Sequence, residues 1–188
     1  ASRLGVSIVP VGGNTGLNGG THSDKSISIS MERMNNIHEI RSSSKIALVE
    51  AGVILTTLHQ AVNENDLMFP LTFGARGSAT IGGVLSTNAG GSNVLKYGNT
   101  RDLVLGVEIV LPNGDIMNLM SELHKDNSGY CLRDLVIGAE GTLGIITQAV
   151  LKLFPKPKAH ATAMVAVNSL DHALALLNEL QEGTGGAV

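Results

Sequence analysis

The sequence predicts a mixed α+β fold, and three observations support this class: short apolar strands, an amphipathic helix between them, and three clusters of glycine. Apolar, mostly β-branched residues dominate VSIVPV at 6–11, and SISIS at 26–30 alternates as a half-exposed strand does. Glycine accounts for 23 of the 188 residues, about 12% where about 7% is usual. The glycines follow no period, so they indicate turns or places where another molecule approaches the main chain.

The first third of the chain is expected to contain four strands and one helix. Residues 1–4 are interpreted as the last turn of a helix, and 6–11 as a strand buried on both faces. The further strands are expected at 26–30, 37–41 and 45–53, with the serines 42–44 as a turn. Residues 54–65 carry apolar side chains at helical spacing, which predicts a helix with His59 on its surface.

The middle of the chain is predicted to return to strands. Residues 102–119 form a β-hairpin pattern with a Pro-Asn-Gly-Asp turn at 112–115. A short helix is expected around 132–137, followed by a long strand at 142–155.

Two prolines, Pro155 and Pro157, are interpreted as a hinge between domains. Beyond them a strand is expected at 161–167, and a helix at 170–180 that Ser169 caps. One strand and one helix cannot bury both of their faces, so the pattern indicates the start of a second domain. The chain is therefore expected to be truncated at its C-terminus, and the abrupt start suggests the same for the N-terminus.

Composition excludes several classes of function. The net charge of −3 and an aromatic content of 3% leave no basic or base-stacking surface for nucleic acid. Cys131 is the single cysteine, and the six histidines lack helical metal-ligand spacing, so no metal site is expected. No transmembrane segment is expected, since no apolar run approaches about 18 residues. Without a secretory signal, the expected location is cytoplasmic, or mitochondrial in a eukaryote.

The glycine clusters are the strongest functional signal. The first, PVGGNTGLNGG at 10–20, follows a predicted strand, which is the setting of phosphate-binding loops. Its spacing is neither G-x-G-x-x-G nor G-x-x-x-x-G-K-[ST], so a dinucleotide fold for NAD and a Walker site are poorly supported. The central cluster, 74–98, is either a cradle for a phosphorylated cofactor or a series of tight turns. A third cluster lies at 138–144.

Together these motifs resemble the FAD-binding domain of the vanillyl-alcohol-oxidase (PCMH-type) flavoproteins. The resemblance is closest to the D-2-hydroxyacid dehydrogenase branch, with D-lactate dehydrogenase, the glycolate oxidase flavin subunit and D-2-hydroxyglutarate dehydrogenase. The matching segments are PVGGNTGLNGG (10–20), SMERMNNIHEI (30–40), SATIGGVLSTNAGG (78–91), KYGNTRDLVLGVEIVLPNG (96–114) and IGAEGTLGIIT (137–147). Cys131 and Thr72 stand where these proteins tend to carry Asp.

The resemblance implies two α+β subdomains with FAD between them at 1–155, without the N-terminal part, and the first β–α unit of a cap domain at 156–188. Main-chain N–H groups would hold the diphosphate, and Arg76 would be the nearest cation. The residues expected to contact FAD are Gly12, Gly13, Asn14, Thr15, Gly16, Leu17, Gly20, Pro70, Gly74, Gly77, Ser78, Gly82, Gly83, Thr87, Asn88, Gly90, Gly91, Tyr97, Gly98, Glu140, Gly141 and Ile146. Relatives that bind FAD covalently carry a histidine where this chain has Asn14, so FAD is expected to be non-covalent.

The implied reaction is oxidation of a D-2-hydroxy acid by hydride transfer to flavin N5, with a separate electron acceptor and a homodimer as one expected assembly. The catalytic base and any metal ligands are expected beyond Val188, so this chain alone should be inactive. His124, Lys125 and Tyr130 are weak candidates, and Tyr130 is expected to pack against the cofactor or the core. The alternatives are another FAD-linked oxidase on the same scaffold, which KDNSGY at 125–130 argues against, and a non-catalytic module that binds a nucleotide or phosphate.

Overall fold

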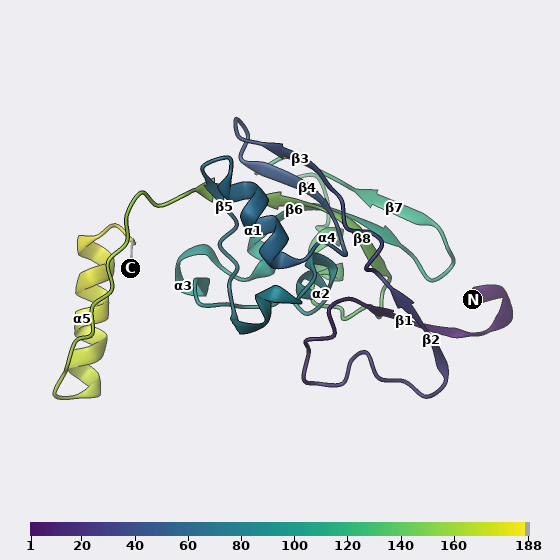
Figure 1. Ribbon diagram of the computed structural model, residues 1–188, viewed down its shortest axis with the longest axis horizontal. Coiled ribbons are helices and arrows are strands. Elements are labelled where there is room, and N and C mark those ends of the chain that lie inside the picture. The colour runs from purple at the N-terminus through teal and green to yellow at the C-terminus, as the bar shows by residue number, and fades with distance from the viewer. Residues whose placement is uncertain (187–188) are drawn as a thin grey trace. The chain divides into compact units, whose positions relative to one another are not determined.

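The computed structural model describes residues 1–186, which form two compact units that divide between Lys156 and Pro157 (Figure 1). The division lies at the prolines interpreted above as a hinge. The assignment of the second unit to a cap domain stays a prediction.

A five-stranded antiparallel sheet is the framework of the first unit. Its strand order is β3 (Ile37–Arg41), β4 (Ile46–Glu50), β8 (Ile145–Lys152), β6 (Val104–Val110) and β7 (Ile116–Leu119). The predicted turn after β3 and the predicted hairpin of β6 and β7 are confirmed. The long strand expected at 142–155 is interrupted instead. β8 ends at Lys152, and β9 (Phe154–Pro155) pairs with β5 (Leu67–Met68) in a separate two-stranded sheet.

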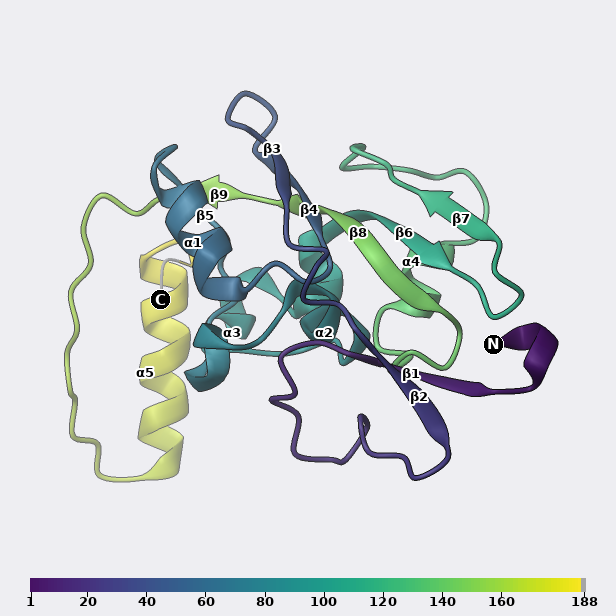
Figure 2. The same cartoon turned by 45° about the vertical axis from the view of Figure 1, so that its right-hand side comes forward.

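Helices α1 (Leu55–Asn63) and α2 (Ile81–Ser86) cover one face of the five-stranded sheet (Figures 1 and 2). The predicted helix α1 buries Leu55, Leu58 and Val62, which share one side of a helical turn. α2 is short and contains two glycines. Because glycine disfavours helices, the sequence of the central glycine cluster did not predict this one. Gly82 allows α2 to approach the end of β4, because a Cβ atom there would lie 2.8 Å from the Cβ of Ala51, the residue after this strand.

Shorter elements connect these layers. α4 (Leu132–Val136) agrees with the helix expected around 132–137. The others are α3 (Val94–Tyr97) and the 3₁₀ turns η1 (Ser2–Leu4), η2 (Gly74–Gly77) and η3 (Thr100–Leu103). The expectation of a helix end at 1–4 is thus reduced to the single 3₁₀ turn η1.

Another two-stranded sheet lies before the main one in the sequence. β1 (Ser7–Val11) and β2 (Ser26–Ser30) pair in parallel, with Ser7 opposite Ser26. The strand expected at 26–30 forms, but four of its five residues are exposed, so the predicted half-exposed alternation is wrong, and so is the prediction that 6–11 is buried on both faces. Among the described residues β1 pairs only with β2, and Ile8 is 37% exposed. The apolar composition of this strand therefore did not indicate how many of its faces are covered by other elements.

The second unit contains α5 (Leu170–Gly183), in agreement with the predicted helix. The Ser169 Oγ atom accepts a hydrogen bond of 3.2 Å from the His172 N–H, so the predicted cap is confirmed. The strand expected at 161–167 does not form. Within the described part of this unit no second strand offers it hydrogen bonds, and a single strand is not stable. No helix in the described range is long and apolar enough to cross a membrane.

Candidate functional site

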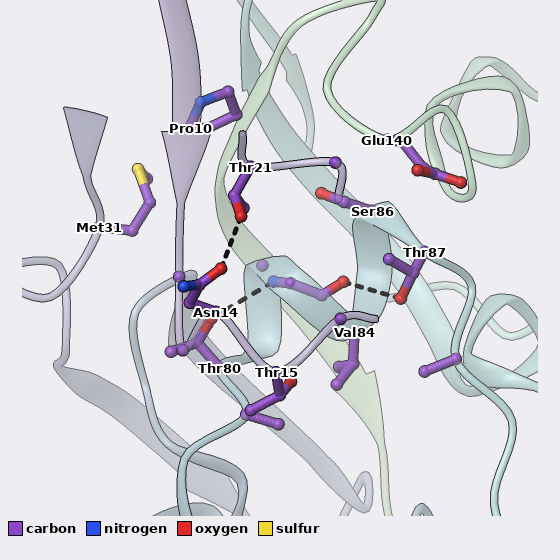
Figure 3. Close-up of a pocket in the computed structure, with 18 of the residues that line it drawn as sticks. Pro10, Asn14, Thr15, Thr21, Met31, Thr80, Val84, Ser86, Thr87 and Glu140 are labelled. Carbon is purple, nitrogen blue, oxygen red and sulfur yellow. Dashed lines mark hydrogen bonds between the residues drawn. The ribbon is translucent and has the colours of Figure 1, made fainter. Parts of the chain in front are cut away.

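Three segments that are distant in the sequence meet around one cavity of ≈ 210 Å³ in the first unit (Figure 3). The first wall is the loop after β1, the second is α2 with its flanks, and the third is the turn that leads into β8. The lining residues are Pro10, Gly12, Gly13, Asn14, Thr15, Gly16, Asn18, Gly20, Thr21, Met31, Phe73, Ala79, Thr80, Gly82, Gly83, Val84, Ser86, Thr87, Ala89, Glu140, Gly144, Ile145 and Ile146.

The first wall presents a run of free hydrogen-bond donors. Within the described range, the main-chain N–H groups from Gly13 to Leu17 find no protein acceptor. Asn14 has a left-handed φ of 50°, and its Oδ1 atom accepts a hydrogen bond of 2.5 Å from the Thr21 hydroxyl across the loop (Figure 3). Successive N–H groups without acceptors form a concavity that favours an anion.

Gly12 and Gly13 have a packing role that the sequence did not suggest. A Cβ atom at Gly13 would collide with the carbonyl oxygen of Ser78, and one at Gly12 with the hydroxyl of Thr80. These two glycines therefore let the first loop pack directly on the segment before α2. The close approach that they permit is between two parts of the protein, and it joins the first wall to the second.

The second wall offers hydroxyl groups rather than free amides. The N–H groups at the start of α2 are already used: Ile81 donates to Val53 O at 2.9 Å, and Gly83 to the Thr80 hydroxyl at 3.4 Å. Ser86 and Thr87 line the cavity from the end of the helix, where the Thr87 hydroxyl donates to Gly83 O at 3.0 Å (Figure 3). Val84 adds an apolar surface between them and the first loop.

The third wall depends on a β-bulge. β6 and β8 pair Glu108 with Gln148 and Ile109 with Ile146, so Thr147 is an extra residue. Its hydroxyl donates to Glu108 Oε1 at 2.7 Å. Without the bulge, Ile146 would share the outer sheet face of Gln148. With it, Ile146 is 4% exposed, belongs to the main core and lines the cavity.

The charge of the cavity is unusual for a phosphate site. Glu140 is the only ionisable residue that lines it, and its Oε2 atom accepts a hydrogen bond of 3.3 Å from the Asn18 amide. Arg76, the expected neighbouring cation, lies in η2 and lines a separate groove. The donors that remain for a diphosphate are the amides of the first loop and nearby hydroxyls, and this donor set fits such a group. The cavity of ≈ 210 Å³ is smaller than typical ligand pockets of roughly 300–1,000 Å³, so its volume fits a diphosphate better than an entire dinucleotide.

The structure brings half of the predicted contact residues to this cavity. Those that line it are Gly12, Gly13, Asn14, Thr15, Gly16, Gly20, Gly82, Gly83, Thr87, Glu140 and Ile146. Those that do not are Leu17, Pro70, Gly74, Gly77, Ser78, Asn88, Gly90, Gly91, Tyr97, Gly98 and Gly141. Several of the latter have structural partners.

Two examples show the nature of these partners. Asn88 Oδ1 accepts the Arg101 N–H at 2.9 Å, and the Tyr97 ring packs edge-on against Phe154 with ring centres 4.7 Å apart. The role of these residues toward a cofactor stays a prediction. Tyr130 was expected to be packed, but it is 96% exposed. His124, Lys125 and Tyr130 all lie outside the cavity lining.

About half of the lining residues could not be named from the sequence. The residues it did not name are Pro10, Asn18, Thr21, Met31, Phe73, Ala79, Thr80, Val84, Ser86, Ala89, Gly144 and Ile145. Most of them stand within one or two positions of a named glycine, so the clusters themselves were the available signal. Met31 follows β2 and had no such signal. No group of three or more potential metal ligands occurs in the described part of the chain.

A family model described as the FAD binding domain matches residues 1–120. The chain belongs to the FAD binding domain family. FAD is its cofactor, as the glycine clusters and the family resemblance predicted. The free amides of the first loop lie within the matched part of the FAD binding domain.

Similarity to known proteins narrows the group of enzymes to which this FAD binding domain is related. D-2-hydroxyglutarate dehydrogenase of Xanthomonas citri pv. viticola is 41% identical over 172 residues, which are 91% of this chain and 36% of that enzyme. Glycolate oxidase subunit GlcD of Bacillus subtilis is 40% identical over 176 residues, 93% of this chain and 37% of that protein. The expected resemblance to the D-2-hydroxyacid dehydrogenase branch is thus confirmed.

Among solved structures, alkyldihydroxyacetonephosphate synthase superimposes with a TM-score of 0.80 at 25% identity. The match covers 98% of this chain and 34% of that chain, and it confirms the α+β flavoprotein fold. The chain spans about a third of the length of the proteins that it matches.

Proposed function

We propose that this chain is the FAD-binding part of an enzyme that oxidises a D-2-hydroxy acid of the lactate, glycolate or 2-hydroxyglutarate type. The observation that carries the proposal is the run of free main-chain N–H groups at 13–17, because residues 13–16 of this run line a cavity without cations. The names of relatives at 40% and 41% identity support the class of reaction.

The residues of this chain would bind, orient and shield the cofactor. The amides of the first loop would hold the diphosphate without a lysine or arginine, and the Thr15 and Ser86 hydroxyls would add hydrogen bonds. Apolar lining residues such as Val84 and Ile146 would exclude water. When bound, FAD supplies the electron acceptor for the hydride that leaves the substrate carbon.

We further propose that FAD is held without a covalent bond. Asn14 occupies the position of the histidine in covalent relatives, and a carboxamide cannot form the histidyl link. After denaturing electrophoresis, the protein band of a flavin-loaded sample should show no flavin fluorescence. Fluorescence that comigrates with the denatured polypeptide would disprove this part of the proposal.

The substrate and the acceptor are assigned by class only. A D-2-hydroxy acid is the proposed substrate, and a separate electron acceptor would reoxidise the flavin. A homodimer is the proposed assembly. A cytoplasmic or mitochondrial location is proposed, because relatives include a mitochondrial D-2-hydroxyglutarate dehydrogenase from Danio rerio. No base is assigned within 1–188, since the candidates His124 and Tyr130 lie outside the cavity lining.

A ligand series tests the binding proposal. FAD, FMN and riboflavin would be titrated into the purified chain, with quenching of flavin fluorescence as the readout. If the free amides hold phosphate, the affinity should follow the order FAD, FMN, riboflavin. Riboflavin binding as tight as that of FAD would contradict the role of the amides, and no FAD binding would contradict the proposed site.

The reaction is tested on the full-length gene product that contains this chain. Reduction of an electron-accepting dye would be measured with the D- and L-enantiomers of lactate and 2-hydroxyglutarate, and with glycolate. Turnover restricted to glycolate or a D-enantiomer is expected. Turnover of the L-enantiomers alone, or of none of these acids, would refute the proposed substrate class.

A further inference from the structure

A second concave site lies on the first unit, in a groove of ≈ 470 Å³ between α1 and the segment 67–76. α1 and β5, which begins this segment, lie side by side in both views (Figures 1 and 2). Its lining shares no residue with the cavity described above. The lining residues are Thr56, His59, Gln60, Val62, Asn63, Leu67, Met68, Phe69, Pro70, Thr72, Arg76, Asn93 and Lys156.

The floor of the groove is apolar and firmly built. Leu67, Phe69 and Val62 belong to the buried core. Asn93 Nδ2 donates to Pro70 O at 2.8 Å, which fixes the chain at the groove floor. Thr56 on α1 donates its hydroxyl to Arg76 O at 2.9 Å, so the two walls are joined directly. This frame gives the groove a defined width.

The charged side chains of the groove are both cationic. Arg76 and Lys156 are the only lysine or arginine residues in the lining, and no aspartate or glutamate lines it. Within the described range, neither the Arg76 guanidinium nor the Lys156 ammonium group forms a hydrogen bond or an ion pair. The backbone of Lys156 is nevertheless held, because its N–H donates to Asp66 O at 3.0 Å. The main chain is therefore held at both residues, whereas the charged ends of the two side chains remain free.

His59, expected on the surface, is half-buried against the opposite wall. Its Nε2 atom lies 2.9 Å from Leu71 O. Burial lowers the pKa of the His59 ring, and the nearby Arg76 lowers it further, whereas main-chain hydrogen bonds raise it. The imidazole is thus neutral at pH 7, and the ring takes part as a hydrogen-bonding group. Amides of Gln60 and Asn63 from the same side of α1 complete a polar rim.

We propose that this groove binds a small organic anion, whose carboxylate or phosphate groups pair with Arg76 and Lys156 and whose carbon chain lies on the apolar floor. An apolar floor with a few convergent polar groups, and a volume within the roughly 300–1,000 Å³ range of ligand pockets, is the usual form of a small-molecule site. Two cations in a lining without aspartate or glutamate give this one its preference for anions. The site is independent of the proposed flavin chemistry.

The test is a titration of the purified protein followed by NMR at low ionic strength. Succinate is the organic probe and inorganic phosphate the inorganic one. In the native protein, saturable shifts are expected at the His59 ring and at the amides of residues 71–72. In the double variant R76Q/K156Q, the loss of two exposed charge contacts should weaken succinate binding by roughly 2- to 30-fold.

A charge-matched control separates the groove from general surface charge. The double variant K25Q/R33Q removes two exposed cations that line neither concave site, and it should bind succinate as the native protein does. Equal weakening in both variants, shifts scattered over other lysines, or no saturable shift would overturn the proposal. Phosphate binding as tight as succinate binding would refute the contribution of the apolar floor.

Titration of the same variants with FAD distinguishes the groove from the cofactor cavity. Because neither Arg76 nor Lys156 lines the cofactor cavity, R76Q/K156Q should retain native FAD affinity. Loss of FAD affinity in this variant would place Arg76 or Lys156 at the cofactor and would overturn the assignment of a separate anion site.

Discussion

Replacement of Gly16 by proline is the most direct test of how the first loop holds the cofactor. The Gly16 N–H has no acceptor within the described part of the protein, so proline would remove one donor without breaking an internal hydrogen bond. A hydrogen bond to a charged group contributes about 1.5–3 kcal/mol. FAD affinity should therefore fall roughly 10- to 150-fold.

Gly16→Ala is the matched control for this substitution. A Cβ atom at Gly16 would lie 3.4 Å from Asn18 Oδ1, an ordinary contact, and the residue does not require a left-handed φ. The alanine variant keeps the N–H group, so its FAD affinity should stay near the native value. Both variants would be compared by equilibrium titration of flavin fluorescence.

Riboflavin distinguishes loss of the donor from general damage to the loop. Because riboflavin lacks the phosphate, its affinity should be the same in Gly16→Pro and Gly16→Ala. The reasoning is refuted if Gly16→Pro binds FAD as tightly as Gly16→Ala. It is also refuted if riboflavin binding declines as much as FAD binding.

Three further predictions concern the cavity charge, the core and pH. Glu140→Gln removes the only lining carboxylate but keeps an acceptor for Asn18, so FAD binding in fluorescence titrations should tighten roughly 2- to 5-fold; weaker binding would mean that the carboxylate accepts a hydrogen bond from the cofactor. Leu85→Ala should lower the free energy of unfolding in urea by about 2–5 kcal/mol, because Leu85 is 0% exposed, while Leu95→Ala at an 83% exposed site should change it by less than about 0.5 kcal/mol. Since the pKa of His59 is lowered by burial, the unfolded chain binds more protons below about pH 6.5, and stability should fall as the pH decreases through that range. Urea unfolding at several pH values should show a smaller fall in His59→Gln, and an unchanged fall would show that His59 does not cause it.

Local patterns in the sequence were sufficient for most elements and for the family. Helical spacing located α1 and α5, alternation located β2, and the Pro-Asn-Gly-Asp turn located the β6–β7 hairpin. These features depend on contacts between near neighbours, which a sequence displays directly. The glycine clusters likewise indicated that main-chain groups would be exposed to a ligand.

Partners of individual strands required the tertiary structure. The apolar strand at 6–11 was expected to be covered on both faces, yet β1 pairs with β2 in a small sheet and stays half exposed. The segment 161–167 has strand composition but no neighbouring strand in the described part of its unit. Strand formation depends on a hydrogen-bonding partner that can be distant in the chain, and composition does not identify that partner.

The sequence by itself predicted that glycine-rich main chain would present donors to a phosphorylated cofactor, because residue types without side chains leave donors exposed wherever the loop goes, and its family resemblance identified that cofactor as FAD. Only the tertiary structure decided which glycines serve the protein's own packing, as Gly12 and Gly13 do against 78–80. It also decided that a bulge at Thr147 turns Ile146 into the cavity and that Arg76 lies in a different groove. Each of these outcomes depends on the register and the separation of segments that are far apart in the chain. Contacts in the folded protein set this register and separation, and the local sequence does not encode them.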